Sequence, residues 1–425
     1  MWDKNCRFGQ KHLVSSFFIR IFATVNVFVD VIMAREDRMK KYLLSLAVMA
    51  MGAGFLTGCQ TDNLDNPVNP IVGEIVVTKG VFVVNNGSSY QAIDGSLTYI
   101  DNTTGKVETD VYKRVNGKSL GGTPNDVIVY GQKVYVVGAD ENMIFVLDTR
   151  NCKELKLVST TELLGDAEGM NPRRIAAYDG KVYFTTYGGY VAAIDTINFT
   201  LQQQYQVGSY PEGLAFDTHS SSAQPKLYVA NSDWSMGNGC ISCIDLASAS
   251  VTDIKNDKVT NPQEIAVSET GTLYVLDYGH YDENFNQKDA GIYMISGNDA
   301  KLVIPNATGM AVLGYYIYTF NDPWGGSGAT YSIYDIRSNY ASTLDLSGDS
   351  GHKLISPCAI SVDPNTGYIY IASRPLDPDT GYPSYALPGF VNVYTNTGRF
   401  IESFNAGVEP HKIEFSYGTA KIVYE

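Results

Sequence analysis

The sequence predicts an all-β fold, and more specifically a seven-bladed β-propeller. Two motifs that recur along the chain carry this prediction, together with a composition rich in tyrosine (30) and glycine (40). Aromatic strands separated by glycine-containing turns are typical of β structure. A repeat of about 40–50 residues with several short strands is typical of a propeller blade.

The first motif is an apolar-aromatic-apolar strand that occurs seven times. Successive copies lie 44 to 53 residues apart, and no helical periodicity accompanies them, which disfavours a solenoid. Their central aromatic residues are Phe82, Tyr135, Tyr183, Tyr228, Tyr274, Tyr318 and Tyr370.

The second motif, Pro-x-x-apolar, precedes most copies of the first. It begins at Pro124, Pro172, Pro211, Pro262, Pro357 and Pro410, and the copy at 307–310 lacks the proline. The copy at Pro410 has no full blade after it, and Phe82 has no such motif before it. We therefore predict that the C-terminal strand completes the first blade and closes the ring, which removes open sheet edges. Because the tail 421–424 resembles another aromatic strand, eight blades is the alternative.

The N-terminal segment predicts a secreted, lipid-anchored protein. Met39-Lys40-Lys41 starts a positive region, an apolar run covers 42–55, and 56–58 (Leu-Thr-Gly) precedes Cys59. This order is typical of a signal peptide, and its end resembles a bacterial lipobox. A transmembrane anchor needs about 20 apolar residues, more than this run provides.

These features predict four segments. Residues 1–38 are an extension from a mis-assigned translation start, 39–58 the lipoprotein signal peptide, 59–74 the acylated Cys59 with a flexible tether, and 75–425 the propeller. Acidic residues behind Cys59 resemble the surface-export signal of Bacteroidetes lipoproteins. We expect a lipid-anchored protein on the outer membrane, at the cell surface.

The charge balance disfavours nucleic acid as a partner. The formal charge of the chain is −14. Residues 1–58 carry eight Lys or Arg and four Asp or Glu, so the remainder carries −18. A body this acidic repels nucleic acids and anionic lipid surfaces, so we expect membrane contact through the lipid anchor only.

Candidate binding residues lie in the loops that follow the second strand of each predicted blade, which share one face of a propeller. These loops cover 85–95, 138–142, 185–190, 230–239, 276–291, 319–330 and 372–389, and hold two of the three tryptophans. Tyr and Trp provide contact area at low entropy cost, and polar neighbours provide hydrogen bonds. We predict ligand contacts from Tyr90, Tyr187, Asn231, Asp233, Trp234, Asp277, Tyr278, Tyr281, Asn321, Asp322, Trp324, Arg374, Tyr382 and Tyr385. Long loops that bury their own aromatics are the alternative.

Polar residues near the start of the predicted inner strands form a second candidate group, at the floor of the pocket. Its members are Arg173, Arg174 and His411, with Asn125, Asp126, Glu212, Gln263, Glu264 and Lys412 beside them. A solvated channel mouth with local salt bridges explains the same residues equally well.

Motifs for catalysis, phosphate binding and metal binding do not occur. No Gly-x-Ser-x-Gly or glycine-rich phosphate loop is present, and no two histidines after the signal have metal-like spacing. We expect no enzyme activity, no cofactor and no metal. Residues 377–381 are better explained as a turn than as a Ca²⁺ site. Cys240 and Cys243 alternate along one strand, so we expect them packed and not bridged.

Two resemblances add to this interpretation. The strands 227–231 (LYVAN) and 81–85 (VFVVN) resemble the YVTN-type, YncE-like propellers. The order of lipobox, tether and propeller, with these loops, resembles the BtuG-type lipoproteins of gut Bacteroidetes. That resemblance implies a protein that captures cobalamin (vitamin B12) and passes it to a TonB-dependent outer-membrane transporter. It also suggests His411 or His280 as a cobalt ligand. A surface glycan-binding propeller is the alternative, because sugars also stack on Trp and Tyr.

Overall fold

The computed structural model describes residues 71–219, 225–284, 287–322, 328–348 and 351–424. Contacts divide the chain into two units, one of which, Val72–Ile422, holds nearly all described residues. The account below concerns this unit.

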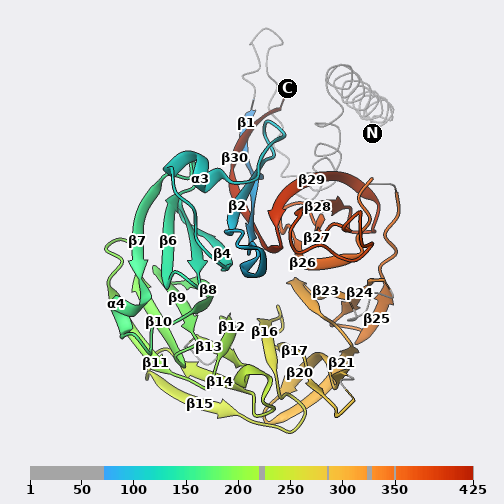
Figure 1. Ribbon diagram of the computed structural model, residues 1–425. Helices are drawn as coiled ribbons and strands as arrows, with labels where there is room; N and C mark the ends of the chain where they lie inside the picture. Colours follow the sequence, from blue (N-terminus) through green and yellow to red (C-terminus); the bar gives the residue numbers. More distant parts are fainter. Residues whose placement is uncertain (1–70, 220–224, 285–286, 323–327, 349–350, 425) are drawn as a thin grey trace, which may run out of the picture. The chain divides into compact units, whose positions relative to one another are not determined.

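Seven four-stranded antiparallel sheets make up the described part of the chain, and they stand around a central channel as the blades of a propeller (Figure 1). From the channel outward, blade one contains β30 (Pro410–Tyr424), β1 (Ile71–Asn85), β2 (Ser96–Asp101) and β3 (Lys106–Glu108); blade two β4 (Pro124–Tyr130), β5 (Lys133–Gly138), β6 (Met143–Asp148) and β7 (Glu154–Ser159); blade three β8 (Pro172–Tyr178), β9 (Lys181–Thr186), β10 (Tyr190–Asp195) and β11 (Leu201–Gln206); and blade four β12 (Pro211–Asp217), β13 (Lys226–Asn231), β14 (Cys240–Asp245) and β15 (Ser250–Ile254). Blade five contains β16 (Pro262–Val267), β17 (Leu273–Asp277), β20 (Gly291–Ser296) and β21 (Asp299–Pro305); blade six β22 (Gly309–Leu313), β23 (Tyr316–Asn321), β24 (Thr330–Asp335) and β25 (Tyr340–Thr343); and blade seven β26 (Ser356–Val362), β27 (Ile369–Arg374), β28 (Pro388–Tyr394) and β29 (Phe400–Val408).

Three small elements lie in the connections between these strands. The helices α3 (Val111–Asn116) and α4 (Thr160–Leu164) precede the inner strands of blades two and three. A short hairpin, β18 (His280–Tyr281) with β19 (Gln287–Lys288), projects from blade five.

The C-terminal strand closes the ring, as the repeat predicted. Blade one has the strand order β3-β2-β1-β30, so its innermost strand comes from the other end of the chain. Tyr424 is the last residue of β30 and does not begin a further blade. The eight-bladed alternative is therefore wrong.

The central aromatic residues of the repeat fill the spaces between blades. Phe82, Tyr135, Tyr274 and Tyr370 are almost completely buried. Tyr135 of blade two, for example, belongs to one apolar cluster with Ile175, Val182 and Phe184 of blade three. Burial of each such side chain stabilises the fold by about 1.5–3 kcal/mol, so the recurring aromatic residue is explained by packing.

Buried carboxylates also join neighbouring blades. Asp126 of blade two accepts the backbone N–H of Ile175 in blade three at 3.0 Å. Glu414 of blade one accepts the backbone N–H of Val129 in blade two at 3.1 Å. These bonds satisfy N–H groups on the channel edge of inner strands, which have no further strand to pair with.

The strand register places the candidate loops on one face. Each inner strand starts beside the end of the second strand, as in the pairs Pro172–Thr186, Pro211–Asn231 and Pro262–Asp277. The loop entering the inner strand and the loop leaving the second strand therefore meet at the same end of every blade. We call this end of the propeller the loop face.

Candidate functional site: the channel mouth and an aromatic cluster

Paired charges occupy the start of the inner strands, a region called the channel mouth and formed by Asn125, Arg173, Arg174, Glu212, Glu264 and His411. Arg173 Nε of β8 donates to both carboxylate oxygens of Glu212 in β12 at 3.1 Å. Tyr187 Oη donates to the same carboxylate at 2.5 Å. Because Glu212 is only 3% exposed, these bonds offset the cost of burying its charge.

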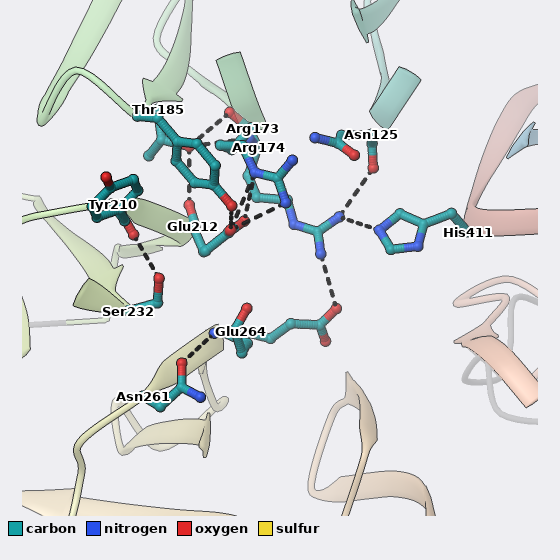
Figure 2. Close-up of polar contacts among 12 residues, drawn as sticks. Asn125, Arg173, Arg174, Thr185, Tyr210, Glu212, Ser232, Asn261, Glu264 and His411 are labelled. Carbon is teal, nitrogen blue, oxygen red and sulfur yellow. Dashed lines mark hydrogen bonds and ion pairs between the residues drawn. The ribbon is translucent and has the colours of Figure 1, made fainter. Parts of the chain in front are cut away.

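Arg174 crosses the channel mouth between blades. Its guanidinium donates to the Asn125 carbonyl at 3.0 Å and lies 3.9 Å from the Glu264 carboxylate. Figure 2 shows Arg174 extending between Asn125, His411 and Glu264, which come from blades two, one and five. One side chain of blade three thus links three other blades.

His411 is held as a neutral imidazole at the channel mouth. Burial, and then the positive charges of Arg174 and Arg173, lower the pKa of His411 well below its ordinary value. Its Nε2 lies 3.3 Å from Arg174 Nη1, and because a guanidinium can only donate, Nε2 must accept. The ring proton therefore resides on Nδ1, and a metal centre reaching Nε2 would have to displace Arg174.

An exposed aromatic cluster stands on the loop face beside the channel mouth. It consists of Tyr187, which follows β9, Tyr210, which precedes β12, and Trp234, which follows β13. Tyr187 lies 5.1 Å from Tyr210 and 5.6 Å from Trp234 between ring centroids, in edge-to-face geometry. The Arg173 guanidinium lies 4.5 Å from the centroid of the Tyr187 ring. Trp234 remains 59% exposed, so the cluster presents a large ring to solvent.

The backbone that carries Trp234 has an unusual conformation. Asp233 and Trp234 are consecutive residues with φ values of 49° and 51°, a region that bulky side chains rarely adopt. Tyr210 also has a positive φ, but so do Thr123, Asn171 and Glu409, which likewise precede the first proline of an inner strand. The conformation of Tyr210 is therefore a property of the repeat, whereas that of Asp233 and Trp234 is specific to this loop.

A second group of polar contacts joins blades six, seven and one on the loop face. Arg374, at the end of β27, pairs with Glu409 and donates to Ser356 Oγ at 2.9 Å. Ser356 Oγ in turn donates to the Asp322 carboxylate at 3.0 Å. Tyr385 covers the Arg374 guanidinium, with its ring centroid 4.6 Å away. Burial raises the pKa of Asp322.

Other predicted contact residues are exposed on the same face. Tyr90, Tyr281 and Tyr382 are 98%, 57% and 74% exposed. Tyr278 is partly exposed, and its hydroxyl donates to the Thr308 carbonyl at 3.3 Å. These tyrosines extend the exposed aromatic surface to blades one, five and seven.

Two predicted contact residues lie in the interior instead. The Asn231 amide donates to Ser242 Oγ at 3.0 Å and to the Cys240 carbonyl at 3.2 Å. The Asp277 carboxylate accepts the backbone N–H groups of Asn261 and Gly279 at 2.9 and 2.6 Å. Both side chains support the backbone of a loop from below, and burial raises the pKa of Asp277 to about 6.

The remaining predicted contacts are placed as follows. Asp233 accepts a hydrogen bond from Asn238 at 3.0 Å, which stabilises its own loop. Asn321 is partly buried at the end of β23. Trp324 and Cys59 lie outside the described residues.

Metal and disulfide sites are absent from the described part of the chain. No three His, Cys, Asp or Glu side chains within it come close enough together to hold a metal ion. Asp377 accepts the backbone N–H groups of Asp379 and Thr380 at 2.8 and 3.1 Å, as expected for a turn. Cys240 and Cys243 are both free thiols. No described helix is long and apolar enough to cross a membrane.

Sequence reasoning missed Tyr210, Ser356 and Glu409, which complete the two groups of contacts on the loop face. All three lie in the loops that enter the inner strands or at the start of such a strand. A signal was available, because Tyr210 and Glu409 each stand directly before the proline of the second motif. Extending the candidate loops to these positions would have found both.

Comparison with known proteins supports the fold and identifies the family. Among solved structures, hydrazine synthase of Kuenenia stuttgartiensis is similar, with a TM-score of 0.52 at 15% identity, over 71% of this chain and 95% of that one. TolB from Acinetobacter baumannii matches at 13% identity and a TM-score of 0.43, over 79% of this chain and 66% of that one. At such identity the hydrazine synthase match shows the propeller fold alone. No curated protein matches. The family model described as "Domain of unknown function (DUF5074)" matches residues 79–372, and the chain belongs to that family.

Proposed function

We propose that this chain is a binding protein, displayed at the cell surface through a lipid on Cys59, that captures cobalamin on its loop face and passes it to a TonB-dependent transporter. The observation that carries the proposal is the exposed cluster of Tyr187, Tyr210 and Trp234 beside the channel mouth. Non-glycine residues with positive φ persist only where the surrounding structure maintains them, and they concentrate at functional sites. Asp233 and Trp234 form such a pair, and they present an indole ring to solvent.

The chemistry of the loop face suits a broad amphipathic ligand. The corrin of cobalamin is an apolar disc with amides at its edge. Tyr and Trp rings pack against such a disc, while nearby carboxylates, amides and guanidinium groups bond the amides. The indole of Trp234 offers the packing surface, and Asp233, Arg173 and Tyr210 surround it with polar groups.

Binding accounts for the channel mouth better than catalysis does. Glu212, Glu264 and Asp126 are the carboxylates that a propeller hydrolase or lyase would use. Glu212 is occupied by Arg173 and Tyr187, and Asp126 by two backbone N–H groups. Glu264 lies 3.9 Å from Arg174. A general base needs a free lone pair within reach of a substrate proton, so these internal partners favour a non-enzymatic role.

A surface glycan is the second candidate ligand. It is favoured by the separated, singly exposed tyrosines Tyr90, Tyr281 and Tyr382, because individual sugar rings stack on individual aromatic rings. A cobalamin would instead concentrate its contacts on the aromatic cluster. The two ligands therefore differ in which residues they require.

Co-elution of cyanocobalamin with the purified protein tests the proposal. Protein incubated with the vitamin and passed through gel filtration should carry its visible absorbance, and calorimetry should show a heat that oligosaccharides do not compete away. Trp234→Ala should reduce this binding. Tyr340→Ala is the matched control, since Tyr340 is 67% exposed on the outermost strand of blade six. Clear glycan binding without any cobalamin signal would replace the first candidate by the second.

A further inference from the structure

A cavity of about 510 Å³ lies inside the channel, on the far side of Arg174 from the loop face. Its lining residues come later along the inner strands than those of the channel mouth. They include the segments 126–128, 213–216, 264–267, 310–314, 360–362 and 412–414. We call this space the lower cavity. Its volume is in the range of small-molecule sites, about 300–1,000 Å³.

The wall of the lower cavity combines apolar side chains with one end that is charged. Ile128, Phe216, Val267 and Leu313 are among the apolar residues that line it. Arg174, Lys412, Asp126, Glu264 and Glu414 line the part next to the channel mouth. Such a space suits an amphipathic ligand with a single polar head directed toward Arg174.

The carboxylates at this charged end already have partners. Asp126 accepts backbone N–H groups from Val127 and Ile175 at 2.9 and 3.0 Å. Glu264 faces Arg174. Glu414 accepts the N–H of Val129, and burial raises the pKa of Glu414 to about 7. A carboxyl group with that pKa is partly protonated at neutral pH and repels an anion less.

Lys412 is the cation that these partners leave over. Within the described residues the structure gives its ammonium group no ion pair, although it lines the cavity in an apolar setting. A partly buried ammonium group favours a nearby negative charge. Arg174 adds a second positive charge at the same end of the cavity.

From this arrangement we propose that the lower cavity is a second binding site, for a medium-chain monocarboxylate whose carboxylate pairs with Lys412 and whose hydrocarbon chain packs along the apolar wall. This site is separate from the aromatic cluster and does not depend on the ligand proposed for the loop face. Arg174, bonded to Asn125 and His411, lies between the two.

Calorimetric titration of the full chain with octanoate, octylammonium and octanol tests the assignment. Octanoate should bind at least tenfold more tightly than the other two, since only it complements Lys412. Preference for octylammonium would overturn the proposal, because the carboxylates would then dominate the site. Equal binding of all three would also overturn it, as the head group would have no role.

Three variants separate the role of Lys412 from a general effect of charge. Lys412→Gln should weaken octanoate binding at least tenfold. Glu414→Gln keeps an acceptor for Val129 and should retain it, and Lys301→Gln, on an exposed position of blade five, should not change it. Unfolding curves confirm that each variant is folded. Octanoate affinity unaffected by Lys412→Gln would refute the site, whereas an intact octanoate site together with failed cobalamin binding would refute only the function proposed for the loop face.

Discussion

The channel mouth and the aromatic cluster are adjacent, but they treat their side chains in opposite ways. At the mouth, Arg173, Glu212 and Arg174 are buried and saturate one another with hydrogen bonds. In the cluster, Trp234 is largely exposed and stands on a backbone that disfavours a bulky residue. Polar groups that satisfy each other stabilise a fold, whereas apolar groups left in water are available to a ligand. The difference assigns a structural role to the mouth and a binding role to the cluster.

The largest expected effect breaks the mouth and leaves the cluster intact. Glu212→Ala removes the partner of Arg173 and of the Tyr187 hydroxyl. Since it leaves a buried guanidinium without its counter-charge, we expect a loss of about 3–5 kcal/mol in the free energy of unfolding. Denaturant unfolding measures it. Arg337→Ala, which breaks the exposed pair with Asp335, is the control and should cost under about 1 kcal/mol. Equal losses in both variants would contradict the structural role of the mouth.

The next effect should appear in binding and not in stability. Trp234→Ala removes an exposed ring, so the free energy of unfolding should change by less than about 0.5 kcal/mol. Binding of the loop-face ligand should weaken by about 1–4 kcal/mol, as for the central residues of an interface. Calorimetry and unfolding on the same preparation give both numbers. A variant that unfolds easily but binds normally would reverse the assignment.

A pH effect should distinguish the buried support of the loops from their exposed surface. Burial raises the pKa of Asp277 to about 6 from 3.8, so the folded state favours its protonated form. The stability from this group is fully present below about pH 4 and is lost as the pH rises through about 6, by an amount on the order of 1–3 kcal/mol. Asp277→Asn should reduce the difference in unfolding free energy between pH 4.5 and 7.5. An unchanged difference would show that other groups cause the pH dependence.

The smallest effect sharpens the extent of the binding surface. Tyr382 is 74% exposed on blade seven, away from the aromatic cluster. If the ligand is a corrin held at blades three and four, Tyr382→Ala should weaken binding by less than about 1 kcal/mol. A loss as large as that of Trp234→Ala, measured by the same calorimetry, would favour a glycan that spans several blades.

Sequence patterns were sufficient for the fold because the information is local and repeated. Each blade carries its own aromatic strand and most carry Pro-x-x-apolar, so the blade number and the closure by β30 followed from spacing alone. The exposed positions of Tyr90, Trp234, Tyr281 and Tyr382 also followed, since loops on one face of a propeller are predictable from strand order. Asn231 and Asp277 were placed on the surface by the same logic, yet their side chains turn inward to bond the backbone.

What the sequence determined by itself is thus the ring, its closure and the face on which the loops gather. Only the tertiary structure decided which polar residues find partners. Arg174 meets Asn125, Glu264 and His411, which belong to three different blades and lie far from it in sequence. The physical reason is that strand periodicity encodes hydrogen bonds within a sheet, whereas ion pairs across a channel depend on the distance between blades. That distance exists only once the ring has closed.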